Sequence, residues 1–534
     1  RQLAEPTFSN ARPDQPQPEF LMSERTQWAL LALAIGIGFY LHIGSMPLFD
    51  LDEGAFTQST REMFLRDDFI SPYLNGEPRF DKPILIYWLQ AASVGLFGFN
   101  EFALRLPSAL AATGWVLLVW AFVARVRGRE AAFWSAFILA TSLQVTVVGK
   151  AAIADATLIL FMTAALFATY LHYLEDRRRW VLLAFVAMGL GFLTKGPVAV
   201  VIPAVVSFLF YAWQGAWRRW FRAVFDPVGI GLFLLIALPW YVLQYLREGQ
   251  AFIDGFFFRH NLQRFSEPIH GHSGGLWFYP VTTLLAVLPF TALVFLALSR
   301  LRQDIRAEAD PLARFLWIWF GFVLVFFSFS GTKLPHYLNY GLTGLVILMA
   351  LALPQARQRF WYLLPPLLVF ALLLALPRLV AVFRDEINPP YVRELLADHL
   401  AWFGPGWYLF LAVVIALCVA GLFLRGLSVP RLLLPVGLAF SLVVNGQLLP
   451  IVGGLQQGPI RDAGKVAADL EGDFVMYGLN TPSFSVYSGH LVDRRQPEPG
   501  EYALTRRDLL DDFAHEPPLF ERAGIVLVRA GKDD

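Results

Sequence analysis

Long apolar stretches are the feature of this sequence that most limits what it can fold into. A segment needs about 20 apolar residues to cross the hydrocarbon core of a bilayer. Of the 534 residues, 56% are hydrophobic and only 16% are charged, whereas charged residues make up about a quarter of an average soluble protein. We therefore predict a polytopic α-helical membrane protein with about 13 transmembrane helices. The apolar stretches lie near 27–44, 104–124, 131–149, 154–174, 180–195, 198–214, 227–246, 276–298, 313–331, 338–355, 360–381, 405–424 and 432–451.

The loops between these stretches alternate in charge. Every second loop is rich in arginine, and loops of this kind face the cytoplasm. Because an odd number of spans puts the termini on opposite sides, we expect a cytoplasmic N-terminus and a C-terminal region on the outer face of the membrane. Over the whole chain, 43 Lys and Arg residues nearly balance 42 Asp and Glu residues, which gives no indication of a nucleic-acid partner. The arginine-rich loops hold Arg125, Arg127, Arg129, residues 177–179, Arg218, Arg219, Arg222, Arg300, Arg302, Arg306, Arg357, Arg359, Arg425 and Arg431.

Three regions follow from composition. Residues 1–26 are rich in Pro, Gln and small polar residues without an apolar period, and they predict a disordered tail. Residues 27–451 form the membrane domain. In residues 452–534 charges return, and short apolar runs at 474–477 and 525–528 predict buried strands of a small α/β domain, with a helix near 506–513.

One apolar segment allows two interpretations. Residues 45–103 form the first loop on the predicted outer face, and within them 83–98 is apolar enough to count as a span. Counting it would break the alternation of the arginine-rich loops, so we place it as a helix lying at the outer interface.

Three carboxylates directly follow the first apolar stretch, in the sequence Asp50-Leu51-Asp52-Glu53-Gly54. A membrane edge solvates a carboxylate less well than water does, so clustered acids there are usually paired, bound to a cation or used as a base. The alternative is an ordinary helix cap, because Asp is common before a helix start.

The predicted outer face collects nearly all the unusual polar residues. Single lysines at span ends often only extend to the headgroups, but a face shared by so many polar residues indicates a common cavity. Besides the three acids, this face holds Asp81, Lys82, Lys150, Asp155, Lys195, His260, Arg264, His270, His272, Lys333, His336 and Tyr337.

Such a cavity suits a reaction between a lipid-borne anion and an acceptor. Lysine and arginine side chains hold phosphate oxygens by charge-assisted hydrogen bonds, and Asp52 or Asp155 is placed to act as a base. The cell exterior lacks nucleotide sugars, so glycosyl transfer there requires a sugar activated on a lipid phosphate. The competing class is a transporter or flippase, but the span pattern shows no internal repeat and the charges gather at one face instead of the midplane. A purely structural scaffold has little reason to place acids and lysines in one band.

These motifs together resemble the bacterial aminoarabinose transferases of lipid A and, more widely, the GT-C glycosyltransferases related to protein O-mannosyltransferases. The resemblance covers nearly the whole chain in order, spacing and sidedness. It is carried by Asp50-Leu51-Asp52-Glu53-Gly54, Asp81-Lys82-Pro83 with Tyr87-Trp88, Asp155, Leu193-Thr194-Lys195-Gly196-Pro197, His260-Asn261-Leu262-Gln263-Arg264-Phe265 and Lys333-Leu334-Pro335-His336-Tyr337.

The resemblance implies a multi-pass protein of the bacterial inner membrane, with a GT-C fold, a soluble C-terminal domain in the periplasm and a sugar donor on a polyprenyl phosphate. It implies that Asp52 is the catalytic carboxylate and Asp155 a second acid of the site. No cofactor is required, and a divalent metal such as zinc in a structural role is left open, because Asp and His are competent zinc ligands. Carried over by motif or by place, the substrate-binding residues are Asp50, Glu53, Lys82, Lys195, Arg264, Lys333, His336 and Tyr337, and the metal positions are Asp81 and His260.

The chain departs from the lipid A enzymes at one point. Those enzymes typically have Arg and Tyr after Asp-Glu-Gly, whereas this chain has Ala55 and Phe56. The change removes a cation beside the catalytic acid, so the class of glycosyltransferase is better indicated than its substrates. The sugar stays open between aminoarabinose and another pentose or hexose, and the acceptor between lipid A, another surface glycan and a protein.

Overall fold

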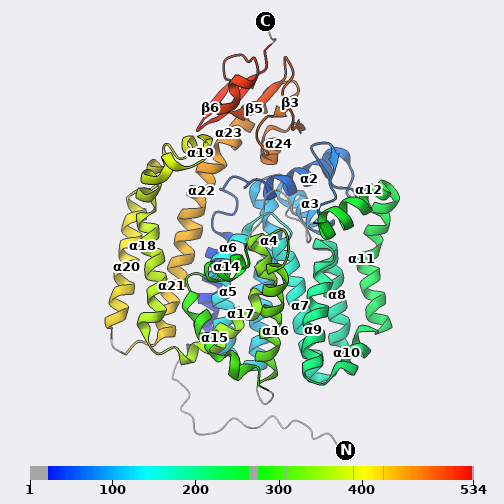
Figure 1. The fold of residues 1–534 in the computed structure, drawn as a ribbon, viewed down its shortest axis with the longest axis vertical. Coiled ribbons are helices and arrows are strands. Elements are labelled where there is room, and N and C mark those ends of the chain that lie inside the picture. Colours follow the sequence, from blue (N-terminus) through cyan, green and yellow to red (C-terminus); the bar gives the residue numbers. More distant parts are fainter. Residues whose placement is uncertain (1–21, 264–274, 307–309, 389, 425, 532–534) are drawn as a thin grey trace, which may run out of the picture.

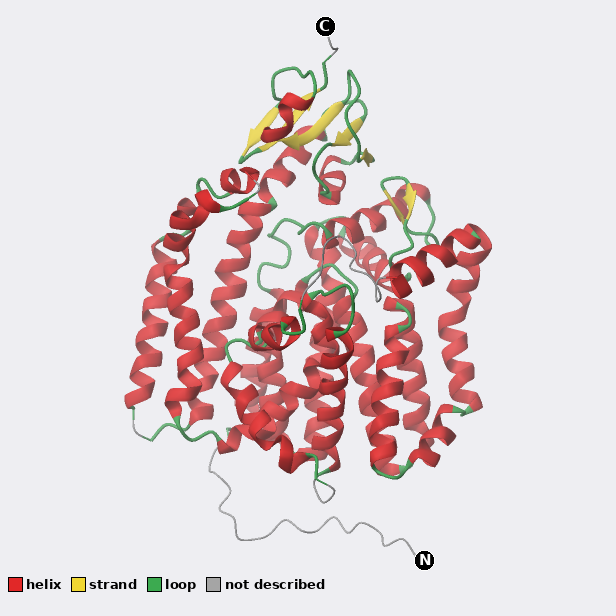
Figure 2. Cartoon of the chain, viewed as in Figure 1, coloured by secondary structure: helices red, strands yellow, loops and turns green. Residues whose placement is uncertain are grey.

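The computed structural model describes residues 22–531 except 264–274, 307–309, 389 and 425. It is a bundle of long helices with a small sheet at one end (Figure 1; Figure 2 shows that the strands gather there and in one short hairpin). The predicted combination of a polytopic helical domain and a small C-terminal α/β domain is confirmed.

Eight helices in the described residues are long and apolar enough to cross a membrane, and up to ten if each of two bent pairs is one span. The bent pairs are α5 (Arg129–Thr141) with α6 (Leu143–Lys150), at 67°, and α14 (Phe278–Ala286) with α15 (Thr291–Asp304), at 120°. The eight are α4 (Glu101–Arg127), α7 (Asp155–Glu175), α11 (Pro227–Glu248), α16 (Pro311–Ser328), Pro335–Gln355 with α17 (Asn339–Ala352) at its centre, Arg359–Glu386 with α18 (Arg359–Phe383), α20 (Pro405–Phe423), and Val429–Gln456, which joins α21 (Val429–Val443), η7 (Val444–Leu448) and α22 (Leu449–Gln456).

All thirteen predicted stretches fall on helices, but three of them are not among these spans. The first is split between α1 (Glu24–Ile35) and the π-helix η1 (Gly36–Tyr40). The others are α8 (Arg178–Lys195) and α9 (Val198–Trp213), and the 16 residues of α9 reach about 24 Å, less than the roughly 30 Å of a hydrocarbon core. The number thirteen therefore stays a prediction.

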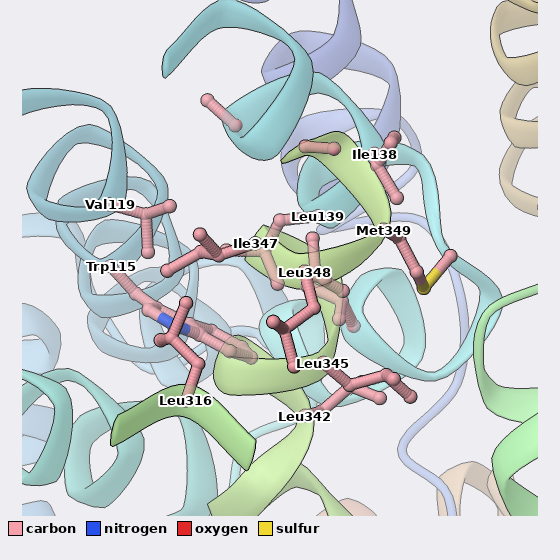
Figure 3. Close-up of a cluster of buried hydrophobic side chains, with 14 of the residues drawn as sticks. Trp115, Val119, Ile138, Leu139, Leu316, Leu342, Leu345, Ile347, Leu348 and Met349 are labelled. Atoms are coloured by element: carbon pink, nitrogen blue, oxygen red, sulfur yellow. The ribbon is translucent and has the colours of Figure 1, made fainter. Parts of the chain in front are cut away.

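Helix α17 lies in the middle of the bundle. Of its most apolar window 89% is buried inside the protein, and Figure 3 shows Leu342, Leu345 and Leu348 packed among side chains of α4, α5 and α16. The indole of Trp115 donates a hydrogen bond of 2.9 Å to Thr343 Oγ1, which satisfies two buried polar groups in this apolar surrounding. This core sets the relative positions of the helices that carry the polar cavity.

Ion pairs draw the arginine-rich loops together at one end of the bundle. Arg125 pairs with Glu175 at 2.5 Å, and Arg178 pairs with Asp226 at 2.8 Å. Arg127 pairs with Asp310, and Arg129 pairs with Glu24 at the start of α1 at 2.6 Å. The C-terminal sheet lies at the opposite end (Figure 1).

The C-terminal domain begins with α23 (Gly458–Ala467). Its sheet has the order β4-β3-β5-β7-β6, in which β3 runs parallel to its neighbours β4 and β5, and β7 runs antiparallel to β5 and β6. The boundary predicted at 452 falls within α22, because that helix continues to Gln456. The helix predicted near 506–513 is a 3-10 helix, η8 (Arg507–Asp512). The strands are β3 (Phe474–Met476), β4 (Val492–Asp493), β5 (Tyr502–Arg506), β6 (Phe520–Arg522) and β7 (Ile525–Arg529), and α24 (Pro482–Ser488) follows β3.

The first loop holds the helices on which the C-terminal domain rests. Helix α2 (Asp52–Arg66) packs against α24, with α3 (Leu85–Phe97) beside it (Figure 1). The 13 residues of α3 reach about 20 Å, too short to cross a hydrocarbon core of roughly 30 Å, which favours the interfacial position predicted for 83–98. The hairpin of β1 (Tyr73–Leu74) and β2 (Glu77–Pro78) joins the two helices.

The remaining described helices connect or flank the spans. They are α10 (Trp217–Val224), α12 (Gln250–Phe252), the π-helix η2 (Ile253–Gln263), η3 (Pro335–Leu338), η4 (Leu353–Gln355), η5 (Arg384–Glu386), α19 (Pro390–Leu395) and η6 (His399–Trp402).

Candidate functional site

A polar cavity of about 250 Å³ lies where the membrane bundle meets the C-terminal domain. Its walls come from the start of α2, the segment between β2 and α3, the start of α7, the end of α8, and η3. The C-terminal domain adds one residue from the loop before α24. The polar lining residues are Asp52, Arg79, Asp81, Lys82, Asp155, Lys195, His336, Tyr337 and Asn480.

Asp155, the first residue of α7, is the centre of a polar network in this cavity. Its buried carboxylate accepts hydrogen bonds of 2.8 and 2.9 Å from Lys195 Nζ and one of 3.2 Å from Tyr340 OH. His336 Nε2 lies 3.9 Å away. The Lys195 ammonium also stands over the rings of Tyr337 and Tyr340, at 5.7 and 5.6 Å. Asp155 therefore holds Lys195 in place at the cavity wall with the help of Tyr340 behind it, and His336 lies close by.

Asp52 has a different environment. It lies in the first turn of α2, where the helix dipole favours a negative charge. Its side chain is exposed and lines the cavity, and no hydrogen bond or ion pair joins it to a residue that the structure describes. Its charge interacts over a longer distance with the guanidinium of Arg79, which lines the same cavity. The carboxylate of Asp52 is thus accessible from the cavity, beside a cation.

Glu53, which we predicted to bind substrate, does not line the cavity. Neighbouring side chains on a helix diverge by about 100°, and Glu53 turns inward to form a bidentate ion pair with Arg105. The distances are 2.8 Å from Arg105 Nε to Oε1 and 2.7 Å from Nη2 to Oε2. The carboxylate also accepts from the backbone N–H of Ala152 at 2.7 Å and of Phe49 at 2.8 Å.

Arg105 connects this ion pair to the loop that carries the acidic motif. Its guanidinium donates to the carbonyls of Ile43 at 3.0 Å, Met46 at 2.8 Å and Pro47 at 2.7 Å. The side chain is only 1% exposed. Arg105 is not among the residues predicted from the sequence, although an arginine within the apolar run of α4 is a signal, since a charge inside a span needs a partner. Arg105 and Glu53 together fix the loop that places Asp52.

Asp50, also predicted to bind substrate, contacts the C-terminal domain instead. Its carboxylate accepts a 2.9 Å hydrogen bond from the N–H of Ser483 in the first turn of α24, and a second bond from the Ser483 hydroxyl. Burial raises the pKa of Asp50 to about 7, although the hydrogen bonds from Ser483 act in the opposite direction. A Cβ at Gly54 would stand 2.1 Å from Asp50 Oδ1 and 2.5 Å from Ser483 N, so this close approach requires glycine.

Lys333, also predicted to bind substrate, makes its hydrogen bonds inside the protein instead. Its buried ammonium donates to the carbonyls of Ser328 at 2.7 Å and Ser330 at 3.0 Å, and the residue is not among those lining the cavity. Because backbone carbonyls already satisfy the charge, Lys333 shapes the chain ahead of η3. Lys82, in contrast, does line the cavity, and its ammonium donates to the carbonyl of Asp81 at 3.0 Å.

The predicted metal positions are only partly described. Asp81 lines the cavity and lies 3.5 Å from the guanidinium of Arg79. His260 lies in η2, but its side chain is outside the described residues, as is the whole of Arg264. No group of three or more His, Cys, Asp or Glu residues is placed to hold a metal ion in the described part of the chain. A metal ion on Asp81 and His260 stays a prediction.

Two cavity residues were missed by sequence reasoning. Arg79 is buried, and its guanidinium lies 4.9 Å from the ring of Phe56. Arg79 lines the same cavity as Ala55 and Phe56. It therefore places a cation near the two positions at which the sequence lacks the Arg-Tyr pair of the lipid A enzymes. Its proximity in sequence to Asp81-Lys82 was the available signal. Asn480 belongs to the C-terminal domain, in the loop that precedes α24. The sequence around Asn480 does not indicate that this loop contributes to the cavity.

The comparisons relate the chain to sugar transferases. The family model described as dolichyl-phosphate-mannose-protein mannosyltransferase matches residues 81–242. An uncharacterized protein of Aquifex aeolicus (strain VF5) is 32% identical over 344 residues, which cover 64% of this chain and 77% of that protein. The undecaprenyl phosphate-alpha-4-amino-4-deoxy-L-arabinose arabinosyl transferase of Pseudomonas paraeruginosa (strain DSM 24068 / PA7) is 29% identical over 514 residues, or 89% of this chain and 91% of that one.

Solved structures share the fold over almost the full length. The crystal structure of ArnT from Cupriavidus metallidurans bound to undecaprenyl phosphate matches with a TM-score of 0.79, at 21% identity, over 96% of this chain and 100% of that chain. The apo structure of the same protein gives a TM-score of 0.78 at 22% identity. This similarity confirms the predicted fold class.

Proposed function

We propose that this chain, which belongs to the GT-C family of membrane glycosyltransferases, moves a sugar from a polyprenyl phosphate to an acceptor at the outer face of a bacterial inner membrane. The observation that carries the proposal is the cavity at one end of the bundle, which the exposed carboxylate of Asp52 lines together with the cations of Arg79, Lys82 and Lys195. A base and a phosphate site side by side suit transfer from a sugar phosphate.

Undecaprenyl phosphate-linked aminoarabinose is the donor that the relatives favour, with lipid A or another surface glycan as acceptor. The Pseudomonas relative covers most of this chain, and its name states that donor. The family model that matches residues 81–242 refers instead to transfer from a dolichyl-phosphate sugar to protein. Protein O-glycosylation is therefore the second candidate function.

The reaction moves one glycosyl group between two oxygens. An acceptor oxygen attacks the anomeric carbon of the sugar, the bond from that carbon to the carrier phosphate oxygen breaks, and polyprenyl phosphate leaves with the electron pair. Asp52 takes the proton of an acceptor hydroxyl, or orients the acceptor if its reacting group is an already ionised phosphate. The exposure of its side chain to the cavity supports this role, because no hydrogen bond from a described residue has to break before the carboxylate meets the acceptor.

The cationic residues of the cavity would hold the leaving phosphate. Lys82 and Tyr337 line the cavity, and Arg264, which lies outside the described residues, is assigned to the same face by the charge pattern of the loops. Lys195, fixed by Asp155, adds a positive charge beside them. Asp155 on this account positions Lys195 rather than exchanging a proton, since its oxygens are already taken.

A transfer assay tests the function directly. Purified protein would be mixed with undecaprenyl phosphate-aminoarabinose and lipid A, and the molecular masses of the products would be measured by mass spectrometry. A lipid A product heavier by one aminoarabinose supports the proposal. A flippase would leave both masses unchanged, and a protein glycosyltransferase would add mass only to a polypeptide acceptor.

Lys82→Ala is expected to weaken binding of undecaprenyl phosphate about tenfold or more. A hydrogen bond to a charged group is worth about 1.5–3 kcal/mol, and this variant removes one from the carrier phosphate. Titration of the purified proteins with undecaprenyl phosphate measures the effect. Lys465→Ala, on α23 of the C-terminal domain, is the matched control. Equal affinities for wild type and Lys82→Ala would remove Lys82 from the phosphate site.

We also propose that the cavity and the C-terminal domain face the periplasm. The ion pairs that bring Arg125, Arg127, Arg129 and Arg178 to the other end of the bundle support this orientation, because arginine-rich loops stay in the cytoplasm. A reporter fused after Asp534 is expected to be active only in the periplasm, and one inserted after Arg178 only in the cytoplasm. A periplasmic signal after Arg178 would mean that 83–98 spans the membrane.

A further inference from the structure

A second cavity of about 320 Å³ lies between the last membrane helix and the C-terminal domain. Apolar side chains make up most of its wall, among them Val452 and Leu455 of α22, Leu395 of α19 and Ile460 of α23. The cavity therefore opens where the span Val429–Gln456 ends, which is the level at which lipid acyl chains meet their headgroups.

This second cavity adjoins the catalytic one through three consecutive residues. Leu479 and Thr481 line the second cavity, while Asn480 between them lines the cavity of Asp52 and Lys82. A molecule that fills the second cavity is thus separated from the catalytic cavity only by the loop ahead of α24. One amphiphile can occupy both, with its apolar part behind the loop and its polar part in front of it.

One polar group in the second cavity is unsatisfied. Gln457 lines it and is only 5% exposed, and its side-chain carbonyl oxygen has no hydrogen-bond partner among the residues that the structure describes. Leaving a buried acceptor unpaired is costly, so such groups in native proteins usually meet a ligand or water. The ligand that completes this site must present an N–H or O–H within an otherwise apolar segment.

That requirement separates the two lipids of the proposed reaction. A polyprenyl chain is a hydrocarbon without a hydrogen-bond donor, so it cannot satisfy Gln457. An acyl chain attached through an amide, or one that carries a hydroxyl, presents such a donor close to its polar head. We propose that the second cavity binds an amide-linked or hydroxylated acyl chain of the acceptor, and that this contact seats the acceptor head beside Asp52. The inference rests on the proposed function and specifies its acceptor as an acylated amphiphile.

Binding of lipid A to the purified 534-residue chain, without donor, tests the site. Gln457→Leu keeps the volume and removes the acceptor oxygen, so it is expected to weaken lipid A binding about three- to tenfold, as for the loss of one hydrogen bond. Leu455→Trp, which fills the cavity, is expected to weaken it at least as much. Both variants should bind undecaprenyl phosphate with wild-type affinity. Gln303→Leu, on an exposed part of α15, is the matched control and should change neither affinity.

A second binding experiment uses lipid A from which the acyl chains have been removed. Deacylated lipid A should bind wild type and Gln457→Leu equally, because it cannot reach the second cavity. The inference is overturned if Gln457→Leu leaves lipid A affinity unchanged, or if it weakens undecaprenyl phosphate binding instead. The transfer assay keeps the two proposals apart. A wild type that transfers no sugar, while Gln457→Leu still lowers lipid A affinity, refutes the proposed reaction and supports the site.

Discussion

Asp52→Asn is expected to lower the rate of sugar transfer by roughly 10²–10⁴-fold, the range that general-base catalysis typically contributes. The substitution keeps the volume of the side chain and removes its charge and basicity. Because no hydrogen bond or ion pair joins the Asp52 carboxylate to a described residue, the substitution removes only its longer-range attraction to Arg79. The variant should therefore fold normally, bind undecaprenyl phosphate like wild type and transfer almost nothing.

The experiment measures transfer from purified donor together with carrier affinity and thermal unfolding. Asp67→Asn is the matched control, because Asp67 is exposed at the other end of the same helix in the left-handed conformation that Asn tolerates. Its transfer rate should equal that of wild type. Near wild-type transfer by Asp52→Asn would show that the proposed mechanism is wrong, and Asp155 would become the next residue to test.

The outer-face assignments from the sequence located much of the candidate site. Loop charge and the motif spacing placed Asp52, Lys82, Asp155, Lys195 and Tyr337 at one end of the bundle, and the structure brings them to one cavity. This part was predictable because membrane spans have few topologies, so sidedness alone confines distant residues to a thin layer.

The partners of the charged residues were not predictable in the same way. Sidedness shows that Glu53, Asp50 and Lys333 lie near the cavity, but not which of them are already satisfied inside the protein. Glu53 forms an ion pair with Arg105, and Asp50 accepts a hydrogen bond from the first turn of α24. Lys333 donates hydrogen bonds to two backbone carbonyls. Such pairings depend on side-chain direction and on contacts far apart in sequence, and neither has a local signature.

The docking of the C-terminal domain is the clearest case of such a long-range contact. Tyr487 OH accepts a 2.8 Å hydrogen bond from the N–H of Leu48 and donates one of 3.1 Å to Glu101. With Ser483 on Asp50, these bonds attach α24 to both ends of the segment that leads into α2. A composition change at the end of the last span predicted a separate α/β domain, but not that its residue Asn480 becomes part of the cavity wall.

Arg105→Met is expected to destabilise the protein strongly, by about 3–5 kcal/mol, which is the usual cost of removing one partner of a buried ion pair. Methionine retains much of the apolar stem, so the loss lies mainly in the charge and its hydrogen bonds. The variant leaves the carboxylate of Glu53, which is 3% exposed, without its cation, and it releases the three carbonyls of Ile43, Met46 and Pro47. Thermal unfolding of the purified variant measures the effect as a lowered Tm.

Arg129→Met is the control for this prediction, because its pair with Glu24 has side chains that are 64% and 51% exposed and such surface pairs contribute only about 0–1 kcal/mol. Adding Glu53→Gln to Arg105→Met should recover part of the lost stability, since it removes the uncompensated buried charge. If Arg105→Met and Arg129→Met lowered the Tm equally, the buried pair would not be what holds the catalytic loop. Asp52 and Glu53 are adjacent in the sequence, but substitutions at the two positions should have different effects. Loss of the Asp52 carboxylate should lower transfer and leave stability unchanged, whereas loss of the Glu53–Arg105 pair should lower stability. The reason is that the turn of one helix places one carboxylate at the cavity and the other against Arg105.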